Sequence, residues 1–193
     1  METTLSKARI ILASVSPRRR ELMAYFGVPF AAVPSNASEK AEGSGIEQVQ
    51  TLAKVKGLEV FKRYPEYPVL SADTLVCFGN MILGKPKSHA KAAQMLSMLS
   101  GRWHQVHTGV CLLTPDGWVH ERLETTNVLF RKIDEKELLR YAASEEPMDK
   151  AGAYAMQGTG SILIERIDGS PSNVIGLPLT TVADLLRDIN LYP

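Results

Sequence analysis

Two long runs of strand-type composition, joined by a short turn sequence, constrain the fold of this chain more than any other feature. The runs cover Trp103–Leu113 and residues 118–131, and the turn between them is TPDG at residues 114–117. Pro and Gly stand there at positions that favour a turn, so we expect a long antiparallel hairpin. Elsewhere strand-like and helical patterns alternate, which predicts an α/β protein with a mixed twisted sheet and flanking helices.

The rest of the chain divides into shorter elements. We expect strands at residues 9–13, 29–33, 68–78, 81–83 and 161–167, helices that follow the capping residues Ser16, Ser44, Ser88 and Asp134, and a final helix over 177–189. Residues 34–45 and the glycine-punctuated residues 152–160 are expected as loops, and residues 169–173 as a turn.

Length, charge and cysteine content exclude several classes of protein. A chain of 193 residues is long enough for one domain over residues 1–193, with two small lobes as an option. Its 22 basic and 21 acidic side chains give a net charge of +1, which argues against nucleic-acid or membrane-surface partners. Cys77 and Cys111 lie in apolar runs and are expected as buried thiols rather than a disulfide. Without a signal sequence or an apolar span, we expect a soluble cytoplasmic protein.

The strongest local motif is a predicted strand-to-helix junction that carries Ser14, Ser16, Arg18 and Arg19. Two hydroxyls, two guanidinium groups and the N–H groups of the first helical turn would converge there. That combination predicts an anion site suited to phosphate. The alternative is a well-capped helix with solvated arginines, and the motif alone leaves both open.

Asp73 interrupts the apolar run PVLSADTLVCF. Burying its carboxylate requires a cationic partner, such as Lys54 or Lys85, or a functional role as a general base or Mg²⁺ ligand. Glu39, in the polar loop, is a second candidate carboxylate, and a simple surface position is the alternative.

Several lysines and histidines complete the candidates. Lys54, Lys56, Lys85 and Lys150 stand beside turns or on helix faces, where each could neutralise phosphate or simply be solvated. His104 and His107 are three residues apart in a strand pattern, so their side chains point to opposite faces and a shared zinc site is not expected.

Nine motifs in order resemble those of the Maf family of nucleoside triphosphate pyrophosphatases. They are ILASVSPRRREL (11–22), LAKVK (52–56), SADTLV (71–76), GKP (84–86), LSGR (99–102), VHTGV (106–110), EPMDKAGAY (146–154), QG (157–158) and VIGLP (174–178). The resemblance implies an inosine-triphosphatase-like fold with a cleft between two lobes. It also implies hydrolysis of a nucleotide to its monophosphate and pyrophosphate, dependent on Mg²⁺ or Mn²⁺.

The same resemblance implies a substrate and a set of site residues. DKAGAY followed by Gln157-Gly158 is similar to the branch that acts on dTTP and UTP, rather than on 7-methyl-GTP, with CTP or modified pyrimidine nucleotides as further substrates in a house-cleaning role. Asp73 is implied as the general base and, with Glu39, as a metal ligand. Substrate-binding positions are Ser14, Ser16, Arg18, Arg19, Lys54, Thr74, Lys85, Lys150 (or its neighbour Asp149) and Gln157, with Arg18, Thr74 and Gln157 linked to base choice.

One stretch departs from the family pattern. Where the family carries an acidic pair, residues 35–40 read SNASEK and retain only Glu39, which predicts weaker metal binding or a metal held mainly by substrate oxygens. The rival hypothesis is therefore a nucleotide-binding regulator of septum formation with little turnover. The sequence leaves the oligomeric state open, with a homodimer as one option.

Overall fold

Seven strands form one mixed sheet in the computed structural model, which describes all residues from 1 to 193. The strands are β1 (Ile10–Leu12), β2 (Phe30–Ala32), β3 (Val69–Phe78), β4 (Met81–Leu83), β5 (Trp103–Leu113), β6 (Val119–Phe130) and β7 (Ile164–Asp168). They pair in the order β2-β1-β3-β5-β6-β7, and β4 pairs with β3. β1 is parallel to β2 and β3, whereas β4 and β7 are antiparallel to their partners. The predicted mixed α/β class is confirmed.

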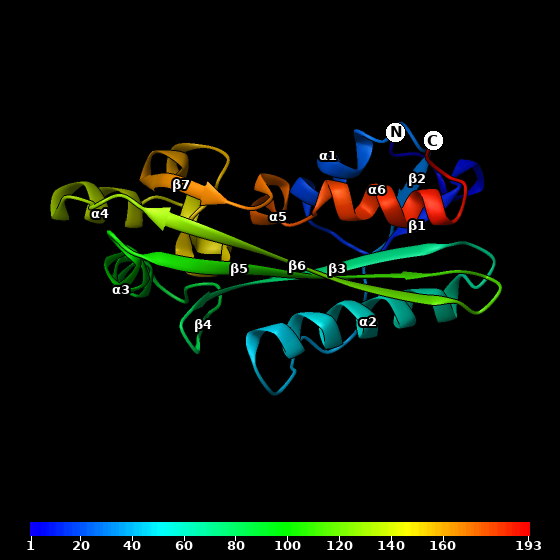
Figure 1. Ribbon diagram of the computed structural model, residues 1–193, viewed down its shortest axis with the longest axis horizontal. Coiled ribbons are helices and arrows are strands. Elements are labelled where there is room, and N and C mark those ends of the chain that lie inside the picture. The colour runs from blue at the N-terminus through cyan, green and yellow to red at the C-terminus, as the bar shows by residue number, and fades with distance from the viewer. The chain divides into compact units, whose positions relative to one another are not determined.

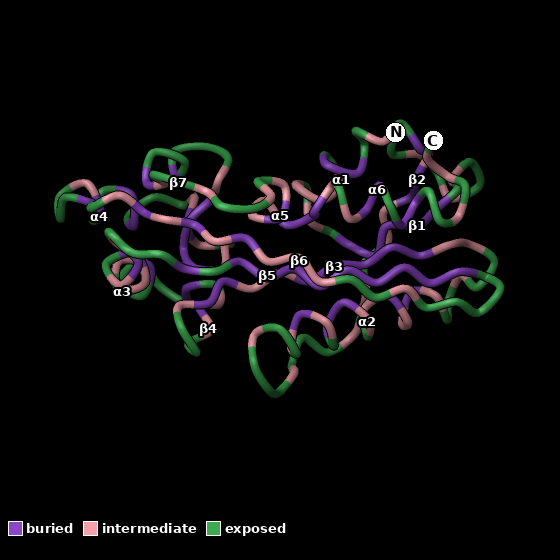
Figure 2. The backbone as a smooth tube through the Cα atoms, viewed as in Figure 1, coloured by how far each residue is buried: buried purple, intermediate pink, exposed green.

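Six α-helices and four short 3₁₀ segments accompany the strands (Figure 1). The helices are α1 (Pro17–Ala24), α2 (Gly45–Arg63), α3 (His89–Leu99), α4 (Glu135–Ala142), α5 (Pro171–Ile175) and α6 (Leu179–Asp188), and the 3₁₀ segments are η1 (Leu5–Lys7), η2 (Glu146–Asp149), η3 (Ala151–Ala153) and η4 (Thr159–Leu163). Buried residues are concentrated along β1, β3 and β5, whereas β7 and much of the loops are exposed or partly exposed (Figure 2). No helix combines the length and apolar content that a membrane crossing requires.

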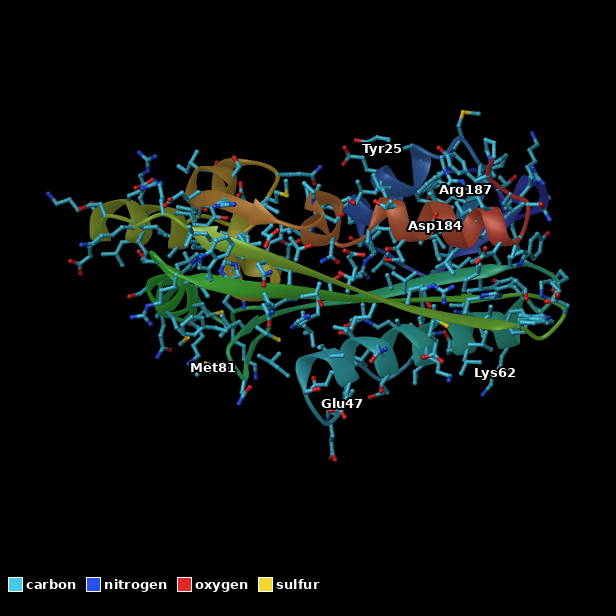
Figure 3. The ribbon with its side chains drawn as sticks, in the orientation of Figure 1. Tyr25, Glu47, Lys62, Met81, Asp184 and Arg187 are labelled. Atoms are coloured by element: carbon cyan, nitrogen blue, oxygen red, sulfur yellow. The ribbon has the colours of Figure 1, made fainter.

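The helix starts form as their capping residues predict. The side chains of Ser16, Ser44 and Ser88 each accept a hydrogen bond from a backbone N–H of the first turn that follows, as does Asp134 before α4. At Ser44 the capping box is complete, because the carboxylate of Glu47 accepts the Ser44 N–H in return at 2.8 Å. Figure 3 shows Glu47 at the start of α2.

Two expected segments near the C-terminus differ from the structure. The strand expected from residue 161 begins only at Ile164, because residues 159–163 form η4. The turn expected at residues 169–173 includes the start of a short helix, α5. The dipeptide Ser170-Pro171 begins that helix: the Ser170 hydroxyl accepts the N–H of Asn173 at 3.4 Å, and Pro suits a first helical position.

By its internal contacts the chain divides into two compact units. The first unit consists of Met1–Asp73, Thr108–Glu124 and Gly176–Pro193, and the second of Thr74–His107 and Thr125–Ile175. Strands β3, β5 and β6 therefore contribute residues to both units.

In the first unit, α2 lies on one side of the strands and α1 and α6 lie on the other (Figure 1). Buried side chains of β1, β3 and α2 form one apolar cluster, which contains Ile11, Val69 and Val60. A second cluster joins Ala53 of α2 to Cys111 and Leu113 of β5. Both cysteines are free and buried, as predicted.

α2 approaches the sheet unusually closely because a glycine lies at the contact point. A Cβ built on Gly109 would stand 2.3 Å from the carbonyl oxygen of Val49, which is backbone and cannot rotate away. Nearby, the Ser71 hydroxyl donates to the carbonyl oxygen of Ala53 at 2.7 Å and ties β3 to the same helix. These contacts fix the position of α2 relative to β3 and β5.

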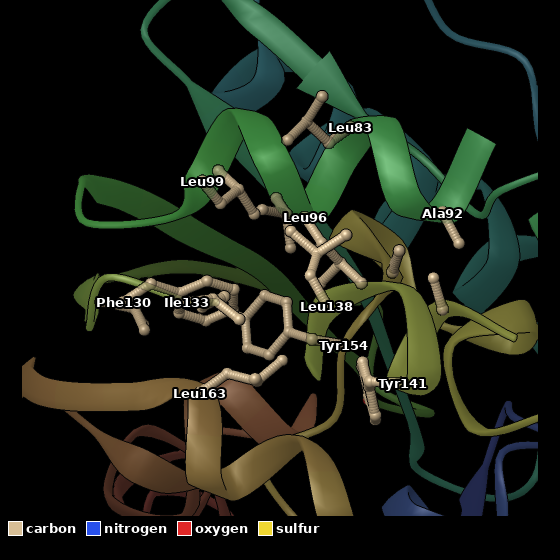
Figure 4. Packing of buried hydrophobic residues seen from close by; sticks show 14 of the residues in the cluster. Leu83, Ala92, Leu96, Leu99, Phe130, Ile133, Leu138, Tyr141, Tyr154 and Leu163 are labelled. Carbon is tan, nitrogen blue, oxygen red and sulfur yellow. The ribbon is translucent and has the colours of Figure 1, made fainter. Parts of the chain in front are cut away.

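The second unit has its own core, part of which Figure 4 shows. Leu96 and Leu99 of α3, Phe130 of β6, and Tyr154 and Leu163 are among its buried members. The buried ring of His104 lies edge-on to Phe130, with its Nε2 atom 2.8 Å from the Tyr154 hydroxyl. Burial lowers the pKa of His104 to about 4, so its imidazole is neutral at physiological pH.

A small substitution at the α2 contact tests this account. We expect Gly109→Ala to lower the free energy of unfolding by about 1–3 kcal/mol or more, because the added methyl group meets backbone atoms of α2. Gly84→Ala is the matched control, since nothing lies within 4 Å of a Cβ built there. Urea unfolding of both variants measures the difference. Equal stabilities would contradict the close contact.

Candidate active site

The junction between β1 and α1 presents two hydroxyls and the first amides of a helix. The Ser14 hydroxyl accepts the N–H of Ser16 at 3.2 Å, and the Ser16 hydroxyl accepts the N–H of Arg19 at 3.4 Å. Pro17 occupies the first helical position and has no N–H to satisfy. The positive end of α1 and the side chains of Arg18 and Arg19 therefore start from one short segment, which is the arrangement expected of an anion site.

Arg19 is held in a defined orientation by a residue far away in the sequence. Its Nε atom donates to the carbonyl oxygen of Gly176 at 2.8 Å. The pKa of Arg19 is lowered overall, chiefly by burial and also by the positive charge of Arg18. The negative charges of Asp73 and Glu39 partly oppose this shift. Arginine nevertheless stays protonated in proteins, so a permanent positive charge lies within electrostatic reach of the Asp73 and Glu39 carboxylates.

Asp73 is the only carboxylate among the buried residues, with 8% of its surface exposed. Its Oδ1 atom accepts a hydrogen bond from the Lys56 ammonium at 2.7 Å. The same ammonium donates to Oε1 of Glu39 at 3.0 Å, although Glu39 itself is largely exposed. Lys56 thus holds together a carboxylate from β3 and one from the polar loop.

The cation beside Asp73 is Lys56, whereas sequence reasoning considered Lys54 or Lys85 as its partner. Lys54 forms an exposed ion pair with Glu121 at 2.7 Å, and this contact raises the pKa of Lys54. Two residues along a helix turn the side chain by roughly 200°, so the two lysines of α2 face opposite ways. The signal was present in the sequence: Val49, Ala53, Lys56 and Val60 follow the spacing of one helix face.

The donor set around Lys56 suits a hard cation with few protein ligands. One carboxylate oxygen of Glu39 and one of Asp73 lie close together, because both contact the same ammonium nitrogen, at 3.0 and 2.7 Å. No group of three or more His, Cys, Asp or Glu side chains that could hold a metal ion is present. Mg²⁺ commonly takes one or two carboxylates and completes its shell with water and phosphate oxygens, so Glu39 and Asp73 fit that ion in number and type of donor, while both also accept a hydrogen bond from the Lys56 ammonium.

The remaining predicted residues belong to the second unit. Thr74 directly follows Asp73 in β3, and Lys85 is exposed just after β4. Lys150 pairs with Asp149 and donates to the carbonyl oxygen of Glu146 at 3.3 Å. Gln157 is exposed on a bend between η3 and η4.

Comparison with known proteins identifies the family. Residues 9–189 match the family described as Maf-like protein. The chain belongs to the Maf family. A relative from Caldicellulosiruptor bescii, named dTTP/UTP pyrophosphatase, is 45% identical over 188 residues that cover 94% of each chain. A protein of the same name from Aquifex aeolicus is 41% identical over 184 residues, covering 95% of this chain and 96% of the relative.

Solved structures of low sequence identity share the fold. A HAM1 protein from Coxiella burnetii superposes with a TM-score of 0.52 at 16% identity, over 94% of this chain and 99% of that protein. A nucleoside-triphosphatase (dITP/XTP pyrophosphatase) from Mycobacterium abscessus gives a TM-score of 0.50, also at 16% identity, over 99% and 96% of the two chains. The expected inosine-triphosphatase-like α/β class is thereby confirmed for this Maf-family chain.

The two lysines of α2 allow a direct test of the Asp73 environment. We expect Lys56→Met to lower the free energy of unfolding by about 3 kcal/mol, because it leaves a buried carboxylate without its cation. Lys54→Met, on the same helix, should change stability much less because its ion pair is exposed. Urea unfolding at neutral pH compares them, and an equally small effect of both substitutions would show that Asp73 does not depend on Lys56.

Proposed function

We propose that this Maf-family protein hydrolyses nucleoside triphosphates, dTTP and UTP first among them, to the monophosphate and pyrophosphate. The observation that carries the proposal is the buried Asp73 carboxylate, held by Lys56 and within electrostatic reach of Arg19. A carboxylate can accept a proton from water, and the neighbouring cations can bind the phosphate oxygens of the substrate. The names of relatives with 41–45% identity support the same activity.

Phosphate binding is assigned to the β1–α1 junction. The amides at the start of α1, the hydroxyls of Ser14 and Ser16, and the guanidinium groups of Arg18 and Arg19 supply hydrogen-bond donors and positive charge. The bond from Arg19 to Gly176 orients the guanidinium plane, which lowers the entropy lost when it binds phosphate.

Asp73 is assigned the role of general base. It accepts a proton from water while the water oxygen bonds to the α-phosphorus and the bond from that phosphorus to the bridging oxygen breaks, releasing pyrophosphate. Lys56 keeps the carboxylate in place and adds positive charge beside the phosphates. Lys54, Lys85 and Lys150 remain proposed as further phosphate contacts.

A divalent cation is proposed at Glu39 and Asp73, of the Mg²⁺ or Mn²⁺ type. When bound, it would offset negative charge on the triphosphate oxygens. Base choice is assigned to Arg18, Thr74 and Gln157. The expected cytoplasmic location, the absence of nucleic-acid partners and the option of a homodimer also stay predictions.

Measurement of pyrophosphate release over a panel of dTTP, UTP, CTP and GTP tests the activity. Asp73→Asn keeps the side-chain volume, so we expect an intact fold and a turnover reduced at least about a hundredfold, the usual scale for a lost general base. Thermal unfolding of the variant is the control. A variant that turns over at the wild-type rate would contradict the assignment of Asp73. Nucleotide binding without release by the wild-type protein would favour the regulator hypothesis instead.

Base selection by Gln157 gives a separate expectation. A carboxamide can pair one donor and one acceptor with the N3–H and carbonyl edge of uracil or thymine, whereas a carboxylate can only accept. Gln157→Glu should therefore lower kcat/KM for dTTP and UTP about tenfold more than for GTP. Steady-state kinetics on the four nucleotides decide this. A uniform decrease would mean that Gln157 does not contact the base.

A further inference from the structure

The loop that carries Gln157 is hydrogen-bonded at one end to the Tyr141 side chain and at the other to the Glu146 side chain. This Gln157 loop (residues 155–160) lies in the second unit, and Gln157 itself is exposed on its bend. Ala155 and Gly160, at its two ends, are buried. Their backbone N–H groups donate to Tyr141 and Glu146, respectively.

Glu146 directs its carboxylate oxygens at this loop and at Tyr141. Oε1 accepts the N–H of Gly160 at 2.7 Å and the Tyr141 hydroxyl at 2.9 Å, while Oε2 accepts the N–H of Thr159 at 3.0 Å. Burial alone raises the pKa of Glu146, but the donors from Gly160, Thr159 and Tyr141, together with Lys150, outweigh it and lower the pKa overall. The carboxylate therefore stays ionised and accepts all three bonds at neutral pH.

Tyr141 connects this carboxylate to the core. Its ring belongs to the buried apolar cluster of the second unit and is seen beside Leu138 and Tyr154 in Figure 4. Its hydroxyl donates to Glu146 and accepts the N–H of Ala155 at 3.3 Å. The loop is thus tied at its first residue to Tyr141 and at its last two residues to Glu146.

Two glycines let the loop lie directly against these side chains. A Cβ built on Gly160 would stand 2.5 Å from the Tyr141 hydroxyl and 2.6 Å from the carbonyl oxygen of Ala155. Gly158 has a φ of +90°, and a Cβ there would stand 2.7 Å from Oε2 of Glu146. The backbone on either side of Gln157 therefore has little room to move toward Tyr141 or Glu146.

We propose that Glu146, acting with Tyr141, is a positioning residue for base selection, because it fixes the backbone on which Gln157 is presented. The inference rests on the proposed function, in which Gln157 contacts the base. Selection by a carboxamide requires donor and acceptor to meet the base edge in register, and small displacements abolish that match. All the side-chain hydrogen bonds described for Glu146 go to the loop or to Tyr141, which fits this role.

Adjacent glutamates provide a matched pair of variants. Glu146→Gln replaces one acceptor with an N–H₂ group that opposes a backbone donor, so we expect kcat/KM for dTTP and UTP to fall about tenfold relative to GTP. We expect this loss in KM, with kcat for dTTP within about twofold of wild type, because the reacting phosphate is not touched. Glu145→Gln removes the same charge from an exposed neighbour and should leave selectivity unchanged. Tyr141→Phe should act in the same direction as Glu146→Gln but less strongly.

Two further measurements separate positioning from general damage to the fold. Hydrogen exchange at the amides of Thr159 and Gly160 should quicken in Glu146→Gln while amides in α3 stay protected. In a Gln157→Ala background, adding Glu146→Gln should cause no further loss of selectivity. The positioning role of Glu146 is wrong if Glu146→Gln leaves selectivity or exchange at these amides unchanged. It is also wrong if the double variant loses further selectivity. The proposed function is unaffected by any of these results. A wild-type protein that hydrolyses no nucleotide overturns the proposed function and this inference with it.

Discussion

The burial of one carboxylate in the middle of an apolar strand determines much of this structure. Asp73 stands in β3, which lies between β1 and β5 in the sheet, and an isolated charge there would cost several kcal/mol. The ammonium of Lys56 must therefore reach it from α2. That reach depends on how closely α2 lies against the strands, which in turn depends on the absence of a side chain at Gly109.

Local sequence patterns predicted the elements around this site because local interactions form them. Each serine or aspartate cap bonds to an amide two or three residues away, so the signal and the structure share the same short stretch. The same holds for the TPDG turn, where the N–H of Gly117 donates to the Thr114 carbonyl. The expected partner of Asp73, Lys54 or Lys85, was wrong, although helix phase distinguishes Lys56 from Lys54, since Lys56 shares a face with buried Val49 and Val60.

Contacts between distant segments were not predictable in this way. The carbonyl oxygen of Gly176 that orients Arg19 is a backbone atom 157 residues away, and any residue type would supply it. Glu146 likewise accepts the backbone N–H groups of Thr159 and Gly160. Because any residue except proline has such a group, the sequence does not mark these positions as partners of Glu146. A 3₁₀ segment replaces the expected start of β7 for the same reason, because Glu146 takes the amides of Thr159 and Gly160 at its start.

The hydrogen-bonding edge of the pyrimidine ring explains why a fixed Gln157 loop would matter if the Gln157 carboxamide contacts the base as proposed. Uracil and thymine share the N3–H and O4 edge, and the methyl group of thymine lies outside it, so one carboxamide orientation serves both dTTP and UTP. Cytosine offers the reverse order of acceptor and donor at N3 and N4. A Gln side chain that turned by half a revolution would pair with it equally well. In the role proposed for Gln157, any discrimination between these bases and cytosine therefore cannot come from the identity of this residue alone. It requires that the amide be held in one orientation, and a backbone anchored to Glu146 and Tyr141 on both sides of Gln157 is the first condition for holding it.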